Sequence, residues 1–537
     1  MGDLKMELEY KKIKDINFGE YDATNYRDSS RRDFFNQLFV RDSRLDEMLQ
    51  SNKYFVLGDK GTGKTAYSVF LSNNVINDTY SSIVYMGETE YVKFIRLKEK
   101  RDLILSDYTD IWKVILLLLM SDKIYKTEDH GIFSGKSFDN LKSAIDDFYY
   151  YAFTPEIKTA IEFVEQAKDS AELVFEHLRG ELGGTREIKF SDTRFQNNLM
   201  FLEKQFINAL EGIKISKKYI IFVDGIDVRP ENIDYNEYLE CVKGLAQAVW
   251  MLNTSIFQGN KYLKKLKVML LIRPDIFDKM GLHNMNNKLN DNCVLLEWRT
   301  AYSHYKTSGL FEVADKLLRS QQDSDIIKNA EIGEVWDHYF PYKVFNHRDR
   351  ANTDSSFIPF LRYSFYRPRD ILAYLSIMQK YCKADQAVFE YSDFNNTQVQ
   401  KEYSHYLLGE IRDNLSFYHP ASDFDLFRNF FQYLKPYVDI KWREFSYSDF
   451  VQAYQTFVDH INKQTGSTPL IFQSADYVLQ LLFELNIIAY IEDYKDGVPY
   501  QRWYFKERSH ANIRPKVKIN AVYRMHKGIA QALYVVL

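Results

Sequence analysis

The residues with the most specific chemistry in this sequence are eight consecutive positions that match the pattern G-x-x-x-x-G-K-[ST], here called the octet. They are Gly58, Asp59, Lys60, Gly61, Thr62, Gly63, Lys64 and Thr65, with Ala66 directly after them. The glycines allow a tight turn with inward-pointing N–H groups, and a helix that begins there adds positive potential for an anion. In such a loop the lysine reaches the β- and γ-phosphates, and the final hydroxyl ligates Mg²⁺. The octet predicts that residues 58–66 bind ATP together with Mg²⁺.

A carboxylate at the end of an apolar run supplies the expected second part of the Mg²⁺ site. The run covers residues 219–223, and Asp224 follows it directly. Because Mg²⁺ prefers oxygen ligands, we expect Asp224 to hold the ion directly or through water. Asp227 lies three residues further on and is the candidate for polarising the attacking water. The alternative for Asp227 is structural, because aspartate also favours turns.

Three arginines are candidates for contacting the nucleotide. Arg273 follows the apolar run 267–272, and α/β sheets bind ligands at the carboxyl ends of their strands. Its guanidinium is suited to a γ-phosphate, with a structural ion pair to a neighbouring carboxylate as the alternative. Arg367 and Arg369 flank Pro368 at an expected helix start. We expect them to reach the nucleotide or a neighbouring subunit, and ordinary surface positions are the alternative.

Five short apolar runs are expected to form the buried strands that position these residues. They cover residues 54–57, 82–86, 218–223, 267–272 and 294–298. Helical stretches separate the runs, and strands that alternate with helices form parallel sheets covered on both faces. We therefore predict an α/β protein with the parallel sheet of a P-loop NTPase.

The second and third strands are separated by about 130 residues, many more than one crossover connection needs. The segments 138–153, 156–178 and 193–210 have helical periodicity, which predicts a large helical insertion over about 90–215. An aromatic cluster at 148–151 is interpreted as core packing, with base stacking as the alternative.

The remaining segments predict four domains in sequence order. Residues 1–50 form an N-terminal helical lead-in, with two short helices within 31–49, and residues 51–300 form the ATPase core. Residues 301–385 predict a helical lid with a helix at 371–381. Residues 386–537 predict a helical region that ends in a winged helix. Its expected parts are a helix at 472–485, a strand at 487–492, a turn at Lys495-Asp496-Gly497 and a return strand at 500–505.

The C-terminal stretch 501–537 is basic although the whole chain has a net charge of −4. Its only acidic residue is Glu507. Its basic residues are Arg502, Lys506, Arg508, Arg514, Lys516, Lys518, Arg524 and Lys527. A basic stretch of this kind in a winged helix is suited to binding the phosphate backbone of DNA or RNA. The alternative interpretations are a solvent-exposed charged face and a protein-interaction module.

Composition excludes several other classes of protein. The chain is 45% hydrophobic and 27% charged, which is an ordinary globular balance and excludes disordered, collagen-like and coiled-coil classes. Cys241, Cys293 and Cys382 lie far apart, form no metal pair or disulfide framework, and suit a reducing cytoplasm. The apolar run 114–120 is too short for a membrane span and predicts a buried helix, so we expect no membrane association. The sequence shows no signature of a nuclease or protease site.

The order of these segments resembles bacterial STAND- and AAA+-type P-loop ATPases. The resemblance rests on the segments GDKGTGKT, FVDGID, LLIRPDIF and RPRDIL, which are followed by the expected winged helix. The Asp224–Asp227 spacing is similar to KAP-type ATPases, and the domain order resembles origin-recognition-type initiators. The segment with Phe18, Gly19 and Ala23 resembles a group of bacterial P-loop ATPases that are often suspected of phage defence. A catalytic glutamate is common directly after the metal aspartate of such enzymes, and here that position is Gly225.

The resemblance implies roles for the arginines and a class of function. Arg273 would be a sensor-1 arginine, and Arg367 or Arg369 a sensor-2 or finger arginine. The chain would be a slow Mg-ATPase that switches its assembly state as a homo-oligomer, works with a separate effector protein and serves in anti-phage defence. The first alternative is an ATP-dependent initiator or loader that binds DNA through the winged helix. The second is a P-loop phosphotransferase, for which the sequence shows no acceptor pocket.

Overall fold

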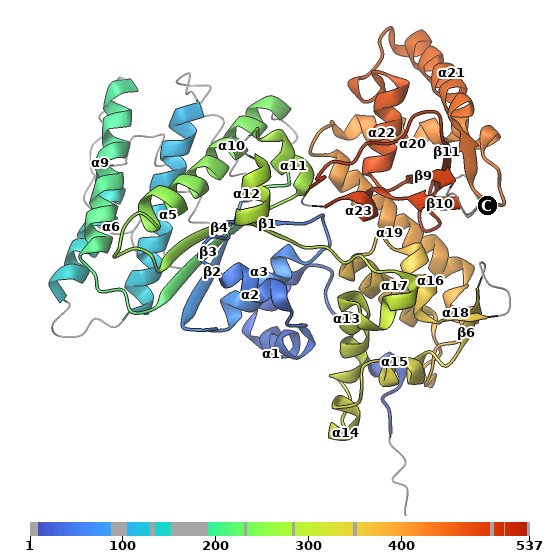
Figure 1. Cartoon of the computed structure of the whole chain (residues 1–537), viewed down its shortest axis with the longest axis horizontal. Helices are drawn as coiled ribbons and strands as arrows, with labels where there is room; N and C mark the ends of the chain where they lie inside the picture. The colour runs from blue at the N-terminus through green and yellow to red at the C-terminus, as the bar shows by residue number, and fades with distance from the viewer. Residues whose placement is uncertain are drawn as a thin grey trace, which may run out of the picture. The chain divides into compact units, whose positions relative to one another are not determined.

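The computed structural model of the chain describes residues 9–86, 105–128, 135–151, 192–229, 234–281, 285–346, 352–493, 499–509 and 511–533 (Figure 1). The chain forms two compact units. The sheet unit consists of Ser43–Gly58 and Lys64–Leu295, and the C-terminal unit consists of Met1–Asp42, Asp59–Gly63 and Leu296–Leu537. The octet is therefore divided, with its central five residues in the C-terminal unit and its flanks in the sheet unit.

A five-stranded parallel sheet in the order β2-β3-β4-β1-β5 forms the centre of the sheet unit. Its strands are β1 (Phe55–Leu57), β2 (Thr79–Tyr85), β3 (Lys218–Asp224), β4 (Leu266–Ile272) and β5 (Cys293–Leu295). Strands covered on both faces are near-continuous apolar runs, which is why the sequence located all five. The predicted α/β class with a parallel sheet is confirmed. The predictions start β2 three residues late and end β5 three residues late.

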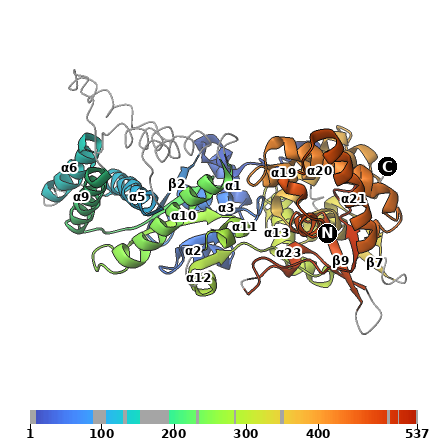
Figure 2. The same ribbon diagram turned by 90° about the horizontal axis from the view of Figure 1, so that it is seen from above.

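Helices cover both faces of this sheet, with α3 on one side and α10 on the other (Figure 1). The helices of the unit are α2 (Ser43–Leu49), α3 (Lys64–Asn73), α5 (Leu105–Thr127), α6 (Gly135–Tyr151), α9 (Asp192–Glu211), α10 (Tyr235–Met251), the π-helix η3 (Leu252–Phe257), α11 (Pro274–Lys279) and α12 (Met285–Asn292). Helices α5, α6 and α9 pack together at one side of the sheet (Figure 2), which agrees with a helical insertion. The predicted segment 156–178 and the side chains at 148–151 lie outside the described residues.

The apolar run at 114–120 lies in α5 and is buried, as predicted. Trp112, Leu116 and Leu117 are each fully inaccessible, because α5 packs against α9, α6 and α10. Among the helices that the structure describes, none combines the length and apolar character that a bilayer crossing requires. All three cysteines are buried free thiols.

The C-terminal unit is mostly helical. Its N-terminal part contains the 3₁₀ helices η1 (Ile13–Asp15) and η2 (Ala23–Arg27) and the helix α1 (Ser29–Leu38). Its remaining helices are η4 (Tyr302–Thr307), α13 (Gly309–Arg319), α14 (Asp325–Lys328), α15 (Glu334–Tyr339), α16 (Phe357–Tyr363), α17 (Pro368–Tyr381), α18 (Tyr391–Phe394), α19 (Thr397–Leu415), α20 (Ala421–Leu434), η5 (Lys435–Tyr437), α21 (Tyr447–Thr465), η6 (Leu470–Phe472), α22 (Ala475–Glu484) and α23 (Tyr504–Glu507). A small antiparallel pair, β6 (Lys343–Phe345) with β7 (Thr353–Ser355), interrupts the helices and was not predicted.

A four-stranded antiparallel sheet lies near the C-terminus, in the order β10-β9-β11-β8. The strands are β8 (Glu444–Ser446), β9 (Ile488–Asp493), β10 (Pro499–Arg502) and β11 (Val522–Met525). The predicted pair of strands is present as β9 and β10, and the predicted turn between them lies outside the described residues. The prediction that the return strand continues to residue 505 is wrong. Tyr504 and Phe505 begin α23, where their rings pack against Phe483 and Tyr366.

His526 is a buried imidazole held by two backbone groups of the C-terminal unit. Nδ1 accepts a hydrogen bond from the N–H of Gly528 at 3.2 Å, so the ring proton is on Nε2, which lies 3.2 Å from the carbonyl oxygen of Ser364. Burial lowers the pKa of His526 to about 3. The imidazole is therefore neutral near pH 7.

Candidate nucleotide site

Three predicted site residues follow neighbouring strands of the parallel sheet. Gly58 follows β1, Asp224 ends β3, and Arg273 follows β4, which lies between β1 and β3. The N–H of Gly58 donates to the carbonyl oxygen of Ile272 at 3.3 Å, which ties the start of the octet to the end of β4. The carboxyl edge of a parallel sheet is where α/β proteins bind ligands.

The hydroxyl of Thr65 meets the carboxylate of Asp224 at this edge. Thr65 Oγ1 donates to Asp224 Oδ2 at 2.6 Å, although 159 residues separate the two positions in sequence. The other carboxylate oxygen, Oδ1, accepts the N–H of Gly225 at 2.8 Å. Asp224 is only 6% exposed. Burial raises the pKa of the Asp224 carboxyl, Asp227 adds to the rise, and the Thr65 hydroxyl, Lys64 and the Gly225 N–H oppose it.

Lys64 is buried beside this pair at the first position of α3. Its Nζ donates to the carbonyl oxygen of Gly58 at 2.8 Å, which closes the octet from within. The first N–H groups of a helix have no partner within the helix, so the start of α3 offers donors and positive potential together. Lys64, Thr65 and Ala66 lie in this first turn, as predicted.

The oxygens of Thr65 and Asp224 fit a Mg²⁺ site. Magnesium binds oxygen ligands at about 2.0–2.1 Å, so two adjacent ligands of one octahedral ion are about 2.9 Å apart. The observed 2.6 Å between Thr65 Oγ1 and Asp224 Oδ2 is close to that separation. These two residues would hold the ion, which would supply charge neutralisation for phosphate oxygens.

Gly225 occupies a position where a side chain would be strained. Its φ is +81°, and a Cβ atom there would lie 3.0 Å from the carbonyl oxygen of Met86. The N–H of Met86 donates to the carbonyl oxygen of Asp224 at 2.8 Å, which keeps the two segments this close. The backbone path therefore disfavours any side chain at this position.

Asp227 lies in the turn that follows, partly exposed and close enough to influence the Asp224 carboxyl. The turn is fixed by the hydroxyl of Tyr238, which donates to the carbonyl oxygens of Ile226 and Val228. Water polarisation by Asp227 stays a prediction.

Arg273 forms the structural ion pair that was its alternative interpretation. Its Nε donates to Asp275 Oδ1 at 3.0 Å, and its Nη2 donates to Asp275 Oδ2. Pro274 begins α11, as predicted, and Arg273 is its N-cap residue. Arg273 is 5% exposed, and its expected contact with a γ-phosphate stays a prediction.

Residues Asp59–Gly63 belong to the C-terminal unit, where charged side chains hold them. Arg508 donates from Nη1 to Asp59 Oδ1 at 2.7 Å and from Nη2 to Asp59 Oδ2. Lys60 pairs with Asp413 and lies 3.7 Å from Glu410. Thr62 is buried, and its hydroxyl donates to the carbonyl oxygen of Asp59 at 2.8 Å.

The two glycines of this segment have the left-handed backbone that the octet pattern requires. Gly61 has φ +84° and Gly63 has φ +99°. A Cβ at Gly61 would lie 3.3 Å from Cβ of Arg369 and 3.6 Å from Cδ of Arg367, so these arginines pack directly on the loop.

No protein-family model, curated protein or solved structure matches this chain. The argument for function therefore rests on the geometry of the octet and of Asp224.

Arg367 is buried, which excludes its interpretation as a surface residue. Nε and Nη2 of Arg367 donate to the carboxylate of Asp370, and Nη1 donates to the carbonyl oxygen of Lys60 at 2.9 Å. Burial opposes the charge of Arg367, but Asp370 and Glu410 outweigh it and raise the pKa of the guanidinium. Arg369 is a quarter exposed, and its Nη1 lies 3.6 Å from Glu410.

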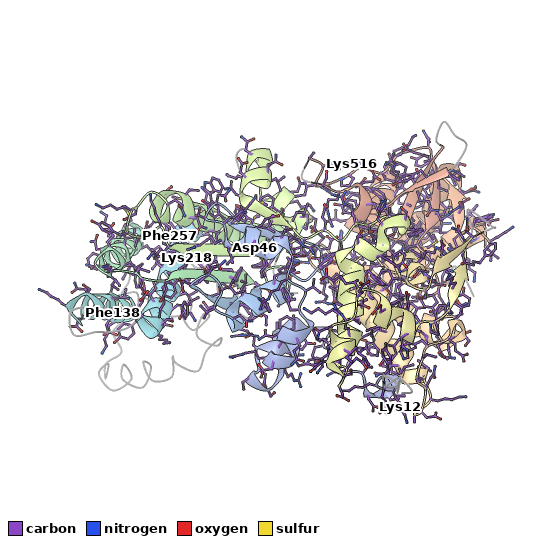
Figure 3. All side chains as sticks on the ribbon, turned by 60° about the horizontal axis from the view of Figure 1, so that its bottom comes forward. Lys12, Asp46, Phe138, Lys218, Phe257 and Lys516 are labelled. Atoms are coloured by element: carbon purple, nitrogen blue, oxygen red, sulfur yellow. The ribbon has the colours of Figure 1, made fainter. Side chains whose placement is uncertain are left out.

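The basic C-terminal stretch is largely neutralised by carboxylates from other segments. Five of its eight cations form ion pairs: Arg502 with Glu492 and Glu507, Arg508 with Asp59, Arg514 with Glu484, Lys518 with Glu492, and Arg524 with Glu444. Lys516 is exposed (Figure 3). Burial lowers the pKa of Lys527 to about 8, and its Nζ lies 4.6 Å from the ring centroid of Tyr363. Nucleic-acid binding by this stretch stays a prediction.

The sequence did not single out Trp298, Asp370 or Glu410, although each contacts the octet or a predicted site arginine. Trp298 Nε1 donates to the carbonyl oxygen of Thr62 at 2.9 Å. Asp370 was visible as the acid three residues after Arg367, which is the spacing of neighbours on a helix surface. Trp298 and Glu410 carried no local signal.

Proposed function

We propose that this protein binds Mg-ATP and acts as a nucleotide-dependent switch with slow ATP hydrolysis. In this proposal the parallel sheet is a P-loop core, and α22 with β9 and β10 is a winged helix. The observation that carries it is the 2.6 Å contact between Thr65 Oγ1 and Asp224 Oδ2. The contact supports a Mg²⁺ site, because both oxygens lie at the sheet edge where the octet begins its helix.

Slow hydrolysis is expected because no carboxylate follows Asp224 directly. The backbone at Gly225 disfavours a side chain, and Asp227 is the next acid in sequence after Asp224 for orienting water. A water-orienting residue in a suboptimal position costs rate without costing nucleotide affinity. We therefore expect binding and hydrolysis to be separable, with Asp227→Asn lowering turnover and leaving ATP affinity within about twofold.

Calorimetric titration of the full chain with ATP, with and without Mg²⁺, tests the binding. The wild type is expected to bind in the presence of Mg²⁺, and Lys64→Ala to lose at least tenfold in affinity. Lys243→Ala is the matched control, because Lys243 is a half-buried lysine in α10 that pairs with Glu240 one turn earlier in the same helix. Absence of ATP binding by the wild type would overturn the proposal. Phosphate release without any acceptor would argue against the phosphotransferase alternative.

Assembly is the expected output of the switch. Light scattering should report a different mass with Mg-ATP than without it, and Lys64→Ala should remove the difference. A mass that is independent of ATP would contradict the switch and leave only nucleotide binding. The homo-oligomer and the effector protein expected from the family resemblance are part of this proposal.

The initiator-type alternative receives less support, because ion pairs occupy five of the eight cations on which it depended. Binding to duplex DNA at low salt tests it. If binding occurs, Lys516→Glu together with Lys518→Glu should weaken it and reduce its salt dependence. The expected result is no measurable affinity.

A further inference from the structure

Three consecutive carbonyl oxygens of the octet are held by donors from distant parts of the C-terminal unit. The oxygen of Lys60 accepts from Arg367 Nη1 at 2.9 Å, and the oxygen of Thr62 accepts from Trp298 Nε1 at 2.9 Å. The oxygen of Gly61 lies 3.4 Å from the N–H of Arg369. The contacts to Lys60 and Thr62 span 307 and 236 residues of sequence.

Holding a carbonyl group fixes the direction of the next N–H group. The described backbone contains no cis peptide bond, and in a trans peptide the C=O of one residue and the N–H of the next point in opposite directions. The donor from Arg367 therefore turns the N–H of Gly61 away from itself, and the donor from Trp298 does the same for Gly63. The N–H of Thr62 between them donates to the carbonyl oxygen of Asp59 at 3.2 Å and stabilises the turn.

Both donor side chains are themselves fixed. Arg367 is 4% exposed, and the fully buried carboxylate of Asp370 accepts from its Nε and Nη2. Asp370 is held in turn by the N–H of Phe365 at 2.9 Å and the hydroxyl of Tyr406 at 3.3 Å. Trp298 is 8% exposed. Donors this well restrained limit the orientations available to the peptide groups that they contact.

We infer that Arg367 and Trp298 are positioning residues, which orient the N–H groups of Gly61 and Gly63 toward phosphate by holding the carbonyl oxygens of Lys60 and Thr62. The inference rests on the proposed function and assigns Arg367 a role different from direct contact with a γ-phosphate. Backbone N–H groups of such a loop contact the α- and β-phosphates, which ATP and ADP share. Loss of either positioning residue should therefore lower the affinities for ATP and ADP by the same factor.

Trp298→Phe is the decisive variant, because it removes the indole N–H and keeps an aromatic ring. Trp336→Phe is its matched control, since Trp336 is a fully buried tryptophan of the same unit whose Nε1 donates to Ser356 Oγ at 3.0 Å. The loss of one hydrogen bond corresponds to about threefold to tenfold in affinity. Mg-ATP and Mg-ADP are titrated calorimetrically into the full chain, and thermal unfolding confirms that each variant folds.

The expected result is that Trp298→Phe weakens ATP and ADP equally by about threefold to tenfold, whereas Trp336→Phe leaves both affinities within twofold. Arg367→Gln should lower both affinities by a larger factor, again without changing their ratio. Wild-type affinity in Trp298→Phe would overturn the inference, and so would a selective loss of ATP affinity in Arg367→Gln. Absence of nucleotide binding by the wild type would instead reject the proposed function.

Discussion

Substituting Gly225 by alanine tests how strongly the backbone after Asp224 disfavours a side chain. Two costs apply to Gly225→Ala. A φ of +81° costs an L-residue about 1–2 kcal/mol, and the new Cβ would lie 3.0 Å from the carbonyl oxygen of Met86. Relief of that contact would strain the hydrogen bond from Met86 N–H to Asp224 O, now 2.8 Å, and adds about 1 kcal/mol. We expect a total loss of about 2–3 kcal/mol in the stability of the sheet unit.

Two other glycines separate the backbone cost from the contact cost. Gly281, also in the sheet unit, has φ +60° with nothing within 4 Å of an added Cβ, so Gly281→Ala should cost about 1 kcal/mol. Gly409 lies in α19, its φ is not positive, and an added Cβ would have nothing within 4 Å of it. Gly409→Ala should therefore stabilise the helix and the folded chain by about 0.5–1 kcal/mol. The difference between Gly225→Ala and Gly281→Ala isolates the contact with Met86.

Thermal unfolding of the full chain measures these effects. For a unit of about 250 residues, 1 kcal/mol corresponds to a shift of about 2 °C in the unfolding midpoint, so Gly225→Ala should lower the midpoint by about 4–6 °C. Gly281→Ala should lower it by about 2 °C. A midpoint for Gly225→Ala at or above that of Gly281→Ala would refute the argument that Met86 excludes a side chain at this position.

Three further expectations concern other groups. His526→Gln should remove a pH dependence of the free energy of unfolding. The pKa of His526 is about 3 in the native state and about 6.5 in the unfolded state, so lowering the pH favours the unfolded state of the wild type. Urea unfolding should show that the wild type loses about 2–3 kcal/mol relative to the variant as the pH falls from about 6.5 to about 4.5. Asp59→Asn should destabilise the C-terminal unit by about 2 kcal/mol, because it leaves the buried guanidinium of Arg508 without its carboxylate. Arg508→Met should cost only about 1 kcal/mol, because the carboxylate that it leaves unpaired is 24% exposed to water. Equal midpoints of the two variants in thermal unfolding would contradict this order. Thr65→Val should raise the Mg²⁺ concentration needed for ATP binding by about tenfold. ATP binding measured in EDTA should be the same in the variant and the wild type, which would show that the substitution removes a metal ligand.

The sequence was sufficient where a single local pattern determines the structure. Four of the five strands are mainly apolar runs, whereas β2 contains Thr79, Ser81 and Ser82 and its start was predicted late; the octet with Asp224 is defined by residue type and by its place next to apolar runs. The edge at which Asp224 meets Thr65 follows from parallel strand order, so that contact was predictable in kind.

Long-range pairing was beyond the sequence. The partners of Asp59 and Thr62 lie 449 and 236 residues away, and nothing local marks Arg508 or Trp298 as their partners. The ion pairs of the basic C-terminal stretch were also beyond the sequence, since their acids include Glu444 and Glu484 from earlier segments. A charge excess counted along a window of sequence says little about surface potential when the opposite charges come from elsewhere in the fold.

The distance in sequence between the octet and its side-chain donors also has a consequence for synthesis on the ribosome. Lys60 emerges 307 residues before Arg367, and at about 5–20 residues per second this corresponds to roughly 15–60 s. During that interval the nascent octet exists without the groups that hold its carbonyl oxygens. The speed of translation between Lys60 and Arg367 thus determines how long the loop lacks this contact, and a chain released before Arg367 would carry the octet without it.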